Sequence, residues 1–243
     1  MDVTFGWGPT EARVLAPSSA CVVVVDVLSF TTAVGVAVES GTAVYPYRWR
    51  DATARAYAER REATLAVGRS EATPEHPWSL SPAALRTAPP TPRLVLPSPN
   101  GSTIAAEAGD ATVVAASLRN RTAVAGWLAE RGYGSGARPL AVIASGERWP
   151  DGSLRPALED LLGAGAVLSA LRAAGPFVLS PEATAAATLW EATDDPVAAL
   201  HRCDSGRELY EYGYPQDVAV ATEVDTSDTV PVLRDGAFQE AAP

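Results

Sequence analysis

One run of eight residues, CVVVVDVL at positions 21–28, limits the possible folds more than any other stretch of the chain. Its four consecutive valines are β-branched and leave neither face polar, as in a strand at the centre of a parallel sheet. The segment that follows, FTTAVGVAVESG at 30–41, has a helical pattern that ends at a glycine. The two segments predict a strand, a tight turn and a helix.

The alternation of strand and helix patterns continues along the chain. We predict strands at 43–47, 64–68, 93–97, 111–116 and 139–145, and helices at 51–61, 119–132 and 156–175. Pro46 predicts that its strand is short or near an edge, and Pro156 suits the first turn of its helix. The pattern indicates an α/β fold with a mostly parallel, doubly wound sheet flanked by helices.

The C-terminal part has a different pattern. Residues 180–213 predict successive short helices, and residues 217–241 predict a strand, a polar stretch and a closing β-hairpin. The length of 243 residues with 47% hydrophobic composition suits a single domain over 1–243, in which 176–243 could form a sub-lobe. The proline-rich segment 68–92 is long enough to be an active-site loop.

Composition excludes several classes of protein. A net charge of −10 argues against a nucleic-acid partner, and we expect anions to be captured locally. All 19 positive residues are arginine, which excludes a lysine Schiff base and a P-loop lysine. Two cysteines are too few for a disulfide framework or a cysteine zinc site. The absence of a signal-like start or a long apolar stretch predicts a cytoplasmic protein without a membrane partner, and a homo-oligomer remains open.

Candidate ligand-binding residues follow the predicted strands, because ligands of open parallel sheets bind beyond the carboxyl ends of the strands. Asp26 ends the valine run, where a buried acid needs a metal, a cation or a helix to cap. Ser29, Thr31 and Thr32 follow it at a predicted helix start, and Arg69 follows the strand at 64–68. These residues predict an anion site.

A second turn, Asn100-Gly101-Ser102-Thr103, follows the strand at 93–97. Glycine allows a close approach of the backbone, and N–H groups with hydroxyls at a helix start can hold a phosphate or a carboxylate. The alternative is a plain helix cap formed by Asn100 or Ser102. Both interpretations remain open at this point.

Acidic residues cluster around the predicted strand at 139–145 and the helix at 156–175. Glu147 follows the strand, and Glu159 and Asp160 lie in the first turn of the helix. Such carboxylates suit Mg²⁺, although the helix dipole alone also favours acids at this position. We expect the acids of the C-terminal part, Asp217, Asp225 and Asp228, to be mostly surface charges.

Five blocks in order resemble the 2-phosphosulfolactate phosphatase family. They are DVLSFTTAV (26–34), SPNGSTIA (98–105), SLRNRTAVAGWL (117–128), IASGERWPDGSLRPALEDLLGAGAV (143–167) and DVAVATEVDTSDTVPVL (217–233). The resemblance implies a Mg²⁺-dependent phosphatase with a small anionic substrate. Its reaction would convert 2-phosphosulfolactate to sulfolactate and phosphate, a step associated with coenzyme M synthesis.

The resemblance also implies roles for individual residues. Asp26 would belong to the metal-phosphate centre, and Glu147, Glu159 and Asp160 would be candidates for metal or water. The two anion-binding turns would be formed by Thr31 and Thr32 and by Asn100, Gly101 and Ser102. Ser29 stands where the family's first block has arginine, so the alternatives are a phosphatase of another phosphorylated carboxylic acid and a catalytically silent anion-binding protein. Whether water or Asp26 attacks phosphorus also remains open.

Overall fold

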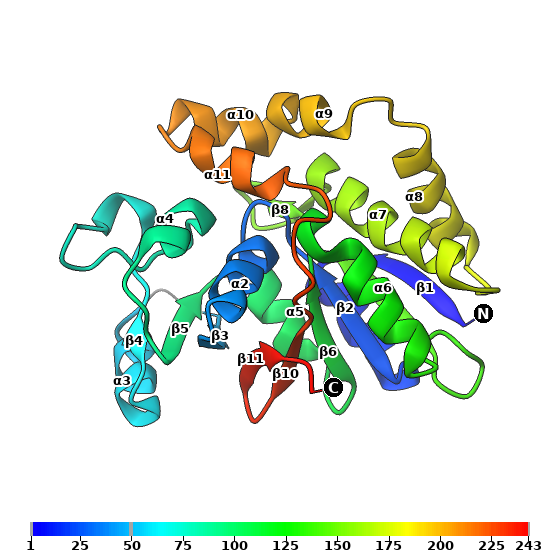
Figure 1. Cartoon of the computed structure of the whole chain (residues 1–243), viewed down its shortest axis with the longest axis horizontal. Helices are drawn as coiled ribbons and strands as arrows, with labels where there is room; N and C mark the ends of the chain where they lie inside the picture. The colour runs from blue at the N-terminus through cyan, green and yellow to red at the C-terminus, as the bar shows by residue number, and fades with distance from the viewer. Residues whose placement is uncertain (1, 49–50, 243) are drawn as a thin grey trace.

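A mostly parallel sheet with helices on both faces forms the centre of the molecule (Figure 1). The computed structural model describes residues 2–48 and 51–242, and within them nine strands form this sheet in the order β1-β7-β2-β6-β10-β11-β3-β5-β4. The strands are β1 Val3–Trp7, β2 Cys21–Val25, β3 Ala43–Tyr47, β4 Thr64–Leu65, β5 Arg93–Pro97, β6 Thr112–Ala116, β7 Leu140–Ala144, β10 Pro231–Arg234 and β11 Ala237–Glu240. The predicted α/β class is confirmed.

The helices alternate with these strands up to residue 174 and then follow one another. They are α1 Gly8–Leu15, α2 Phe30–Glu39, α3 Ala52–Arg61, α4 Pro82–Thr87, α5 Gly101–Glu107, α6 Arg121–Glu130, α7 Leu158–Ala174, α8 Pro181–Glu191, α9 Pro196–Arg202, α10 Asp204–Glu211 and α11 Pro215–Ala221. Short 3₁₀ turns lie at η1 Ala16–Ser18, η2 Arg69–Glu71 and η3 Leu118–Asn120. Among the described residues, no helix is both long enough and apolar enough to cross a membrane.

The C-terminal hairpin lies inside the sheet. Strand β10 pairs antiparallel with β6, β10 with β11, and β11 with β3. The other pairs of the sheet, β1-β7, β7-β2, β2-β6, β3-β5 and β5-β4, are parallel. The hairpin therefore joins a four-stranded and a three-stranded parallel block, and three antiparallel steps make the two blocks run in opposite senses.

Strand β2 shows why both faces of the sheet are covered. Val23 and Val25 pack into a core with side chains of α6, α7 and α8, whereas Val22 and Val24 pack into a second core with α1, α2 and α5. All five residues of β2 are buried. The run of valines is explained by this position, since each side of a central strand needs an apolar surface.

Three local predictions are wrong. The strand predicted at the start of 217–241 is part of helix α11, which has Pro215 at its first position, and alternating valines in so short a segment fit either structure. Pro46 lies in a strand paired on both sides, where β11 contacts β3 only at Val44 and so requires no N–H from Pro46. Pro156 precedes α7, which begins at Leu158.

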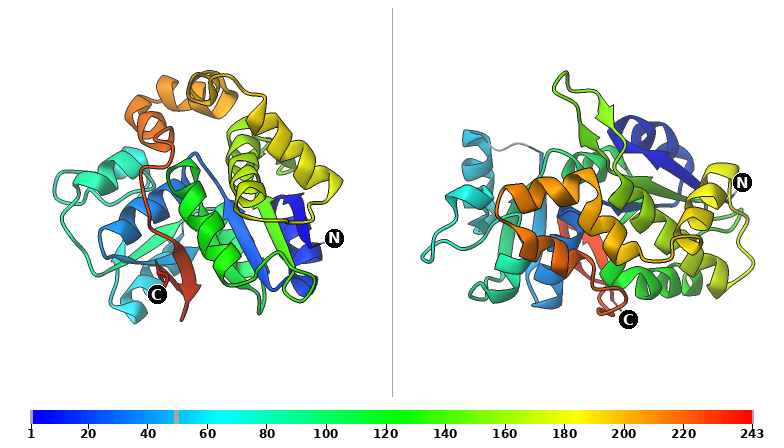
Figure 2. Two further views of the ribbon diagram at one scale, coloured as in Figure 1. Left: turned by 45° about the vertical axis from the view of Figure 1, so that its right-hand side comes forward. Right: turned by 90° about the horizontal axis from the view of Figure 1, so that it is seen from above.

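Some elements had no sequence prediction. Strand β1 and helix α1 precede the valine strand, and the two-residue strands β8 Glu147–Arg148 and β9 Leu154–Arg155 form a separate small hairpin. Helices α9, α10 and α11 run across one end of the molecule, beyond α7 and α2, in the views of Figures 1 and 2. Helix α11 at this end carries Asp217, which bonds to Arg69.

Candidate functional site

Asp26 caps two helices at once. Its Oδ1 accepts the backbone N–H of Phe30, the first residue of α2, at 3.0 Å, and its Oδ2 accepts the N–H of Gly101, the first residue of α5, also at 3.0 Å. The hydroxyl of Ser145 lies 3.4 Å from Oδ2. The side chain is only 6% exposed, and burial is the main cause that raises the pKa of Asp26 to about 6. The helix-capping interpretation of Asp26 is confirmed.

Gly101 allows the second turn to approach Asp26. A Cβ atom on this residue would lie 2.9 Å from Oδ2 of Asp26 and closer still to the ring of Phe30. The side chain of Asn100 makes no cap hydrogen bond to α5, so the plain-cap alternative is wrong for this residue. Glycine is required here because no side chain fits between the two turns.

The hydroxyls of Thr31 and Thr32 stabilise the turn that follows β2. Oγ1 of Thr31 donates to the carbonyl of Asp26 at 2.8 Å and accepts its N–H at 3.0 Å. Oγ1 of Thr32 donates to the carbonyl of Val27 at 2.8 Å. Both side chains are buried, so the structure shows them shaping the first turn. Their predicted contact with an anion stays a prediction.

Asp160 ties the same turn to the end of β7. Its Oδ1 accepts the N–H of Val27 at 2.7 Å, and its Oδ2 accepts the N–H of Gly146 at 2.8 Å. The side chain is 3% exposed, and burial, together with the charges of Asp26 and Glu159, raises the pKa of Asp160 well above its usual range. A carboxylate at the start of α7 thus fixes both neighbouring loops, and its predicted role as a metal ligand stays a prediction.

Glu147 and Glu159 complete the acidic group. Glu147 accepts a hydrogen bond on Oε2 from Nδ2 of Asn100 at 3.0 Å, and burial with the charge of Asp26 raises the pKa of Glu147 to about 7. Glu159 is 2% exposed, and its Oε2 accepts a bond from the thiol of Cys203 at 3.3 Å. Within the described residues, Oε1 of each glutamate has no hydrogen-bond donor.

The acidic group supplies only some of the ligands that a Mg²⁺ site needs, and its predicted binding of Mg²⁺ stays a prediction. Among residues 2–48 and 51–242, no three His, Cys, Asp or Glu side chains are grouped so as to hold a metal by themselves. Mg²⁺ commonly uses one or two carboxylates and takes its other ligands from water and phosphate. Oε1 of Glu159 has no hydrogen-bond donor in the described part of the chain and is a hard oxygen of this kind, whereas both oxygens of Asp26 already accept backbone N–H groups.

Arg69 brings a positive charge to this end of the molecule from the 3₁₀ turn η2. Its Nη2 donates to the hydroxyl of Ser29 at 2.5 Å, and its Nε donates to Oδ2 of Asp217 at 2.8 Å. Asp217 is 0% exposed, so its expected place on the surface is wrong, whereas Asp225 and Asp228 are exposed. The sequence carries no local signal for Asp217 because its partner lies 148 residues away.

Ser102 faces a different part of the molecule. It lines a cavity of about 340 Å³ with Ala105 and Ala106 of the same helix and with Tyr47 and Tyr57. Its Oγ is buried and has no hydrogen-bond partner in the described part of the chain. No described contact joins Ser102 to Asp26, and its predicted contact with substrate stays a prediction.

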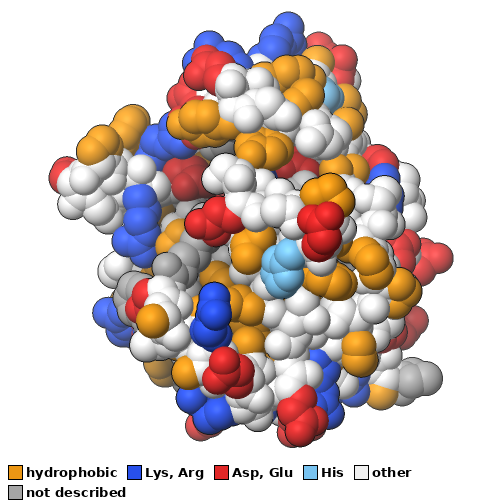
Figure 3. Space-filling view, turned by 90° about the vertical axis from the view of Figure 1, so that its left-hand side faces the viewer, with side chains coloured by type: hydrophobic (Ala, Val, Ile, Leu, Met, Phe, Trp, Pro, Cys, Tyr) orange, Lys and Arg blue, Asp and Glu red, His pale blue; other side chains and the backbone are white. Residues whose placement is uncertain are grey.

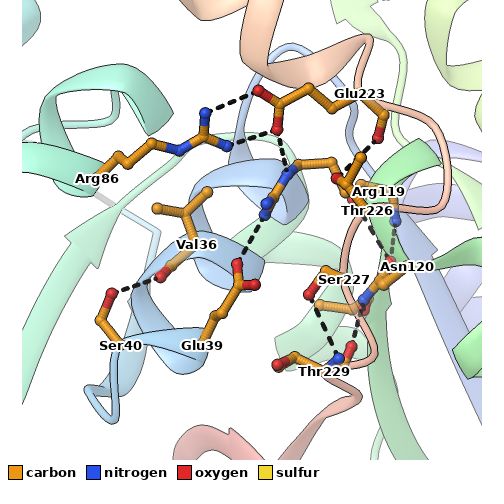
Figure 4. A network of polar contacts seen from close by, with 12 residues as sticks. Val36, Glu39, Ser40, Arg86, Arg119, Asn120, Glu223, Thr226, Ser227 and Thr229 are labelled. Atoms are coloured by element: carbon orange, nitrogen blue, oxygen red, sulfur yellow. Dashed lines mark hydrogen bonds and ion pairs between the residues drawn. The ribbon is translucent and has the colours of Figure 1, made fainter.

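The segment 68–92 is anchored to the rest of the protein by ion pairs. Arg86 of α4 donates to both oxygens of Glu223 at 2.7 and 2.6 Å, and Glu223 also accepts from Nε of Arg119, which pairs with Glu39 of α2 (Figure 4). On the outer face that carries α3 and α4, acidic and basic side chains are interspersed (Figure 3). The visible face therefore offers no extended positive surface to attract an anion.

Comparisons with known proteins match most of the chain to one family. A family model described as 2-phosphosulpholactate phosphatase matches residues 10–236. A protein of Deinococcus radiodurans named "Probable 2-phosphosulfolactate phosphatase" is 31% identical over 146 residues, which cover 59% of this chain and 57% of that relative. The alignment thus spans little more than half of the relative's length.

Proposed function

Because the chain belongs to the 2-phosphosulfolactate phosphatase family, we propose that it hydrolyses the phosphate ester of 2-phosphosulfolactate to sulfolactate and inorganic phosphate, the reaction associated with coenzyme M synthesis. The observation that carries the proposal is the double cap formed by Asp26 beside Arg69 and a group of acids. Through Ser29, Arg69 contacts the turn that Asp26 caps, so a cation for the substrate's anionic groups and carboxylates that can handle protons and a metal would serve the same turn.

Arg69 binds the substrate in this proposal. A guanidinium donates charge-assisted hydrogen bonds to phosphate or sulfonate oxygens, and these bonds are about twice as strong as neutral ones. Ser29 and Asp217 hold the arginine side chain in place. Among the other predicted binding residues, Asn100 and Gly101 position Glu147 and Asp26, respectively.

Water is the nucleophile that the geometry favours. Both oxygens of Asp26 already accept backbone N–H groups, so this carboxylate is held as a fixed acceptor and is a weaker nucleophile. Glu147 has a free oxygen and a pKa near 7, which suits a general base that takes a proton from water. The water oxygen bonds to phosphorus, the P–O ester bond breaks, and the leaving alkoxide takes up a proton to give the hydroxyl of sulfolactate.

Asp26, Glu159 and Asp160 would hold Mg²⁺, which would neutralise phosphate charge when it is bound. Hydrogen bonds within the chain hold these carboxylates and the loops around them in place. Asp160 fixes the backbone at Val27 and Gly146, and Cys203 orients Glu159 through its other oxygen.

The experiment that tests the function is an assay of phosphate release from 2-phosphosulfolactate with Mg²⁺, after EDTA treatment, and with other phosphorylated acids in parallel. We expect Mg²⁺-dependent release that Asp26→Asn abolishes, whereas Asp151→Asn, in an exposed turn, leaves it unchanged. Better turnover of a phosphorylated carboxylic acid would replace the substrate. No release from any ester by the folded protein would refute the proposed activity.

A further inference from the structure

Asp217 is a fully buried acid to which the proposed mechanism assigns no step. Its Oδ2 accepts from Nε of Arg69 at 2.8 Å, and its Oδ1 accepts from the hydroxyl of Ser81 at 2.5 Å and from the N–H of Ala83 at 3.2 Å. Burying a carboxylate is costly unless a cation and hydrogen bonds compensate it. Here one oxygen holds the arginine and the other holds the start of α4.

The guanidinium of Arg69 is fixed at two of its three nitrogens. Nε contacts Asp217 and Nη2 contacts Ser29, and since the group is planar, these two contacts determine its orientation. Nη1 has no hydrogen-bond partner among the described residues. Arg69 also borders a cavity of about 370 Å³ with Ser81 and Tyr214. The arginine therefore keeps donors available for a ligand.

The first N–H groups of helices α2 and α5 are not available to a ligand, which makes Arg69 more important for binding an anion. The N–H groups of Phe30 and Gly101, which begin α2 and α5, already donate to Asp26. These two groups are thus occupied within the protein and cannot bind a phosphate oxygen at the same time. Arg69 brings a cation into contact with the turn that carries Ser29, so its placement affects how an anion is captured there.

We propose that Asp217 is the positioning residue of this site: from helix α11 it holds Arg69 in the orientation that binds the anionic groups of the substrate. The proposal rests on the proposed function, since it assigns Arg69 to the substrate. It gives the C-terminal helices a role in the site, because α11 packs against α4 and carries the acid that directs Arg69 (Figure 1).

Glu223 provides a matched control. It lies just beyond the other end of α11 and holds Arg86, also in the segment 68–92, through two hydrogen bonds of 2.7 and 2.6 Å. Both acids therefore anchor the segment 68–92, Asp217 from within α11 and Glu223 from just after it. Only Asp217 contacts the arginine that reaches Ser29, so comparing the two variants separates orientation of Arg69 from anchoring of the segment.

The test measures kinetics and the thermal shift caused by inorganic phosphate in Asp217→Asn, Glu223→Gln, Arg69→Ala and the two double variants with Arg69→Ala. We expect Asp217→Asn to raise KM by about tenfold, to remove most of the phosphate shift, and to have no further effect when Arg69 is already alanine. We expect Glu223→Gln to lower the melting temperature but to keep KM and the phosphate shift.

The outcomes separate the two proposals. If phosphate stabilises the wild type and Asp217→Asn equally, or if the effects of Asp217→Asn and Arg69→Ala simply add, the positioning role is refuted while the phosphatase proposal stands. No phosphate shift and no turnover in the wild type would overturn both. Should Asp217→Asn not fold, Asp217→Glu, which keeps the charge and moves it by one methylene, takes its place with the same expected loss of the phosphate shift.

Discussion

The backbone N–H of Gly101 lies 3.0 Å from Oδ2 of Asp26, and this bond joins two turns that are 75 residues apart in the chain. A glycine is needed on one side because an added Cβ would collide with Phe30 and Asp26. We expect Gly101→Ala to lower the free energy of unfolding by about 1–3 kcal/mol, as overpacked core positions do, and to reduce phosphatase activity strongly.

Thermal denaturation and phosphate release measure the effect of Gly101→Ala. The control is Gly126→Ala in α6, where an added Cβ meets no atom within 4 Å and alanine is the better helix former. A variant Gly101→Ala as stable and active as Gly126→Ala would show that the close approach to Asp26 is unimportant.

Asn100 affects the pKa of Glu147, the proposed general base. Its Nδ2 donates to Oε2 of Glu147. Burial raises the pKa of Glu147 to about 7, and the bond from Asn100 keeps it from rising further. Asn100→Ala removes the donor, so the pKa of Glu147 rises further and the base becomes protonated at higher pH. The acidic limb of the profile of kcat/KM against pH should therefore move to higher pH, whereas Thr103→Ala, in a partly exposed position of α5, should leave it in place. A shift to lower pH would contradict the assignment.

Stability of the metal-free protein should depend on pH through Glu147. The pKa of Glu147 is about 7 in the folded protein against an ordinary value of 4.5, so its contribution to stability is present below pH 4.5 and is lost as the pH rises through 7. In EDTA, the unfolding free energy of the wild type should fall between pH 5 and 8. In Glu147→Gln this fall should be smaller by on the order of 2 kcal/mol. Urea titrations at several pH values measure this; parallel profiles for both proteins would disprove it.

Arg119 connects α2 with the segment after α11. Its side chain is 6% exposed and bonds to Glu223 and Glu39, each at 3.1 Å. Removing a buried cation from two carboxylates should cost about 2 kcal/mol in Arg119→Ala. Arg13→Ala breaks an ion pair of 2.9 Å whose arginine is 65% exposed, and it should cost at most about 0.5 kcal/mol. Equal costs in urea denaturation would mean that burial of Arg119 contributes nothing.

The parts of the fold that the sequence predicted correctly have strong local patterns. The valine strand and the helix at 30–41 correspond to β2 and α2, and the hairpin predicted in the C-terminal part is β10–β11. Segments with mixed patterns were missed or wrong. Strand β1 was missed because one of its five residues is glycine, which weakens a strand pattern. The strand predicted at the start of 217–241 is helical because its burial against α4 and α10 decides its structure.

The candidate site was predictable only where a residue's environment follows from its own segment. The place of Asp26 at the end of a buried strand and of Asp160 in the first turn of α7 could be predicted in this way. Asp217 could not, since its burial depends on Arg69 and Ser81 from a distant segment. Ser102 was grouped with Gly101 by adjacency, but consecutive residues of a helix face different directions.

The position of the β10–β11 hairpin has a consequence for biosynthesis. Strands β6 and β3 are joined only through residues 231–240, which are synthesised after every other strand of the sheet. Until these residues emerge from the ribosome, the nascent chain has two separate half-sheets with unpaired inner edges, a state prone to association with other chains. Completion of the sheet is thus a late step in folding, because both parallel blocks are synthesised before the hairpin that joins them.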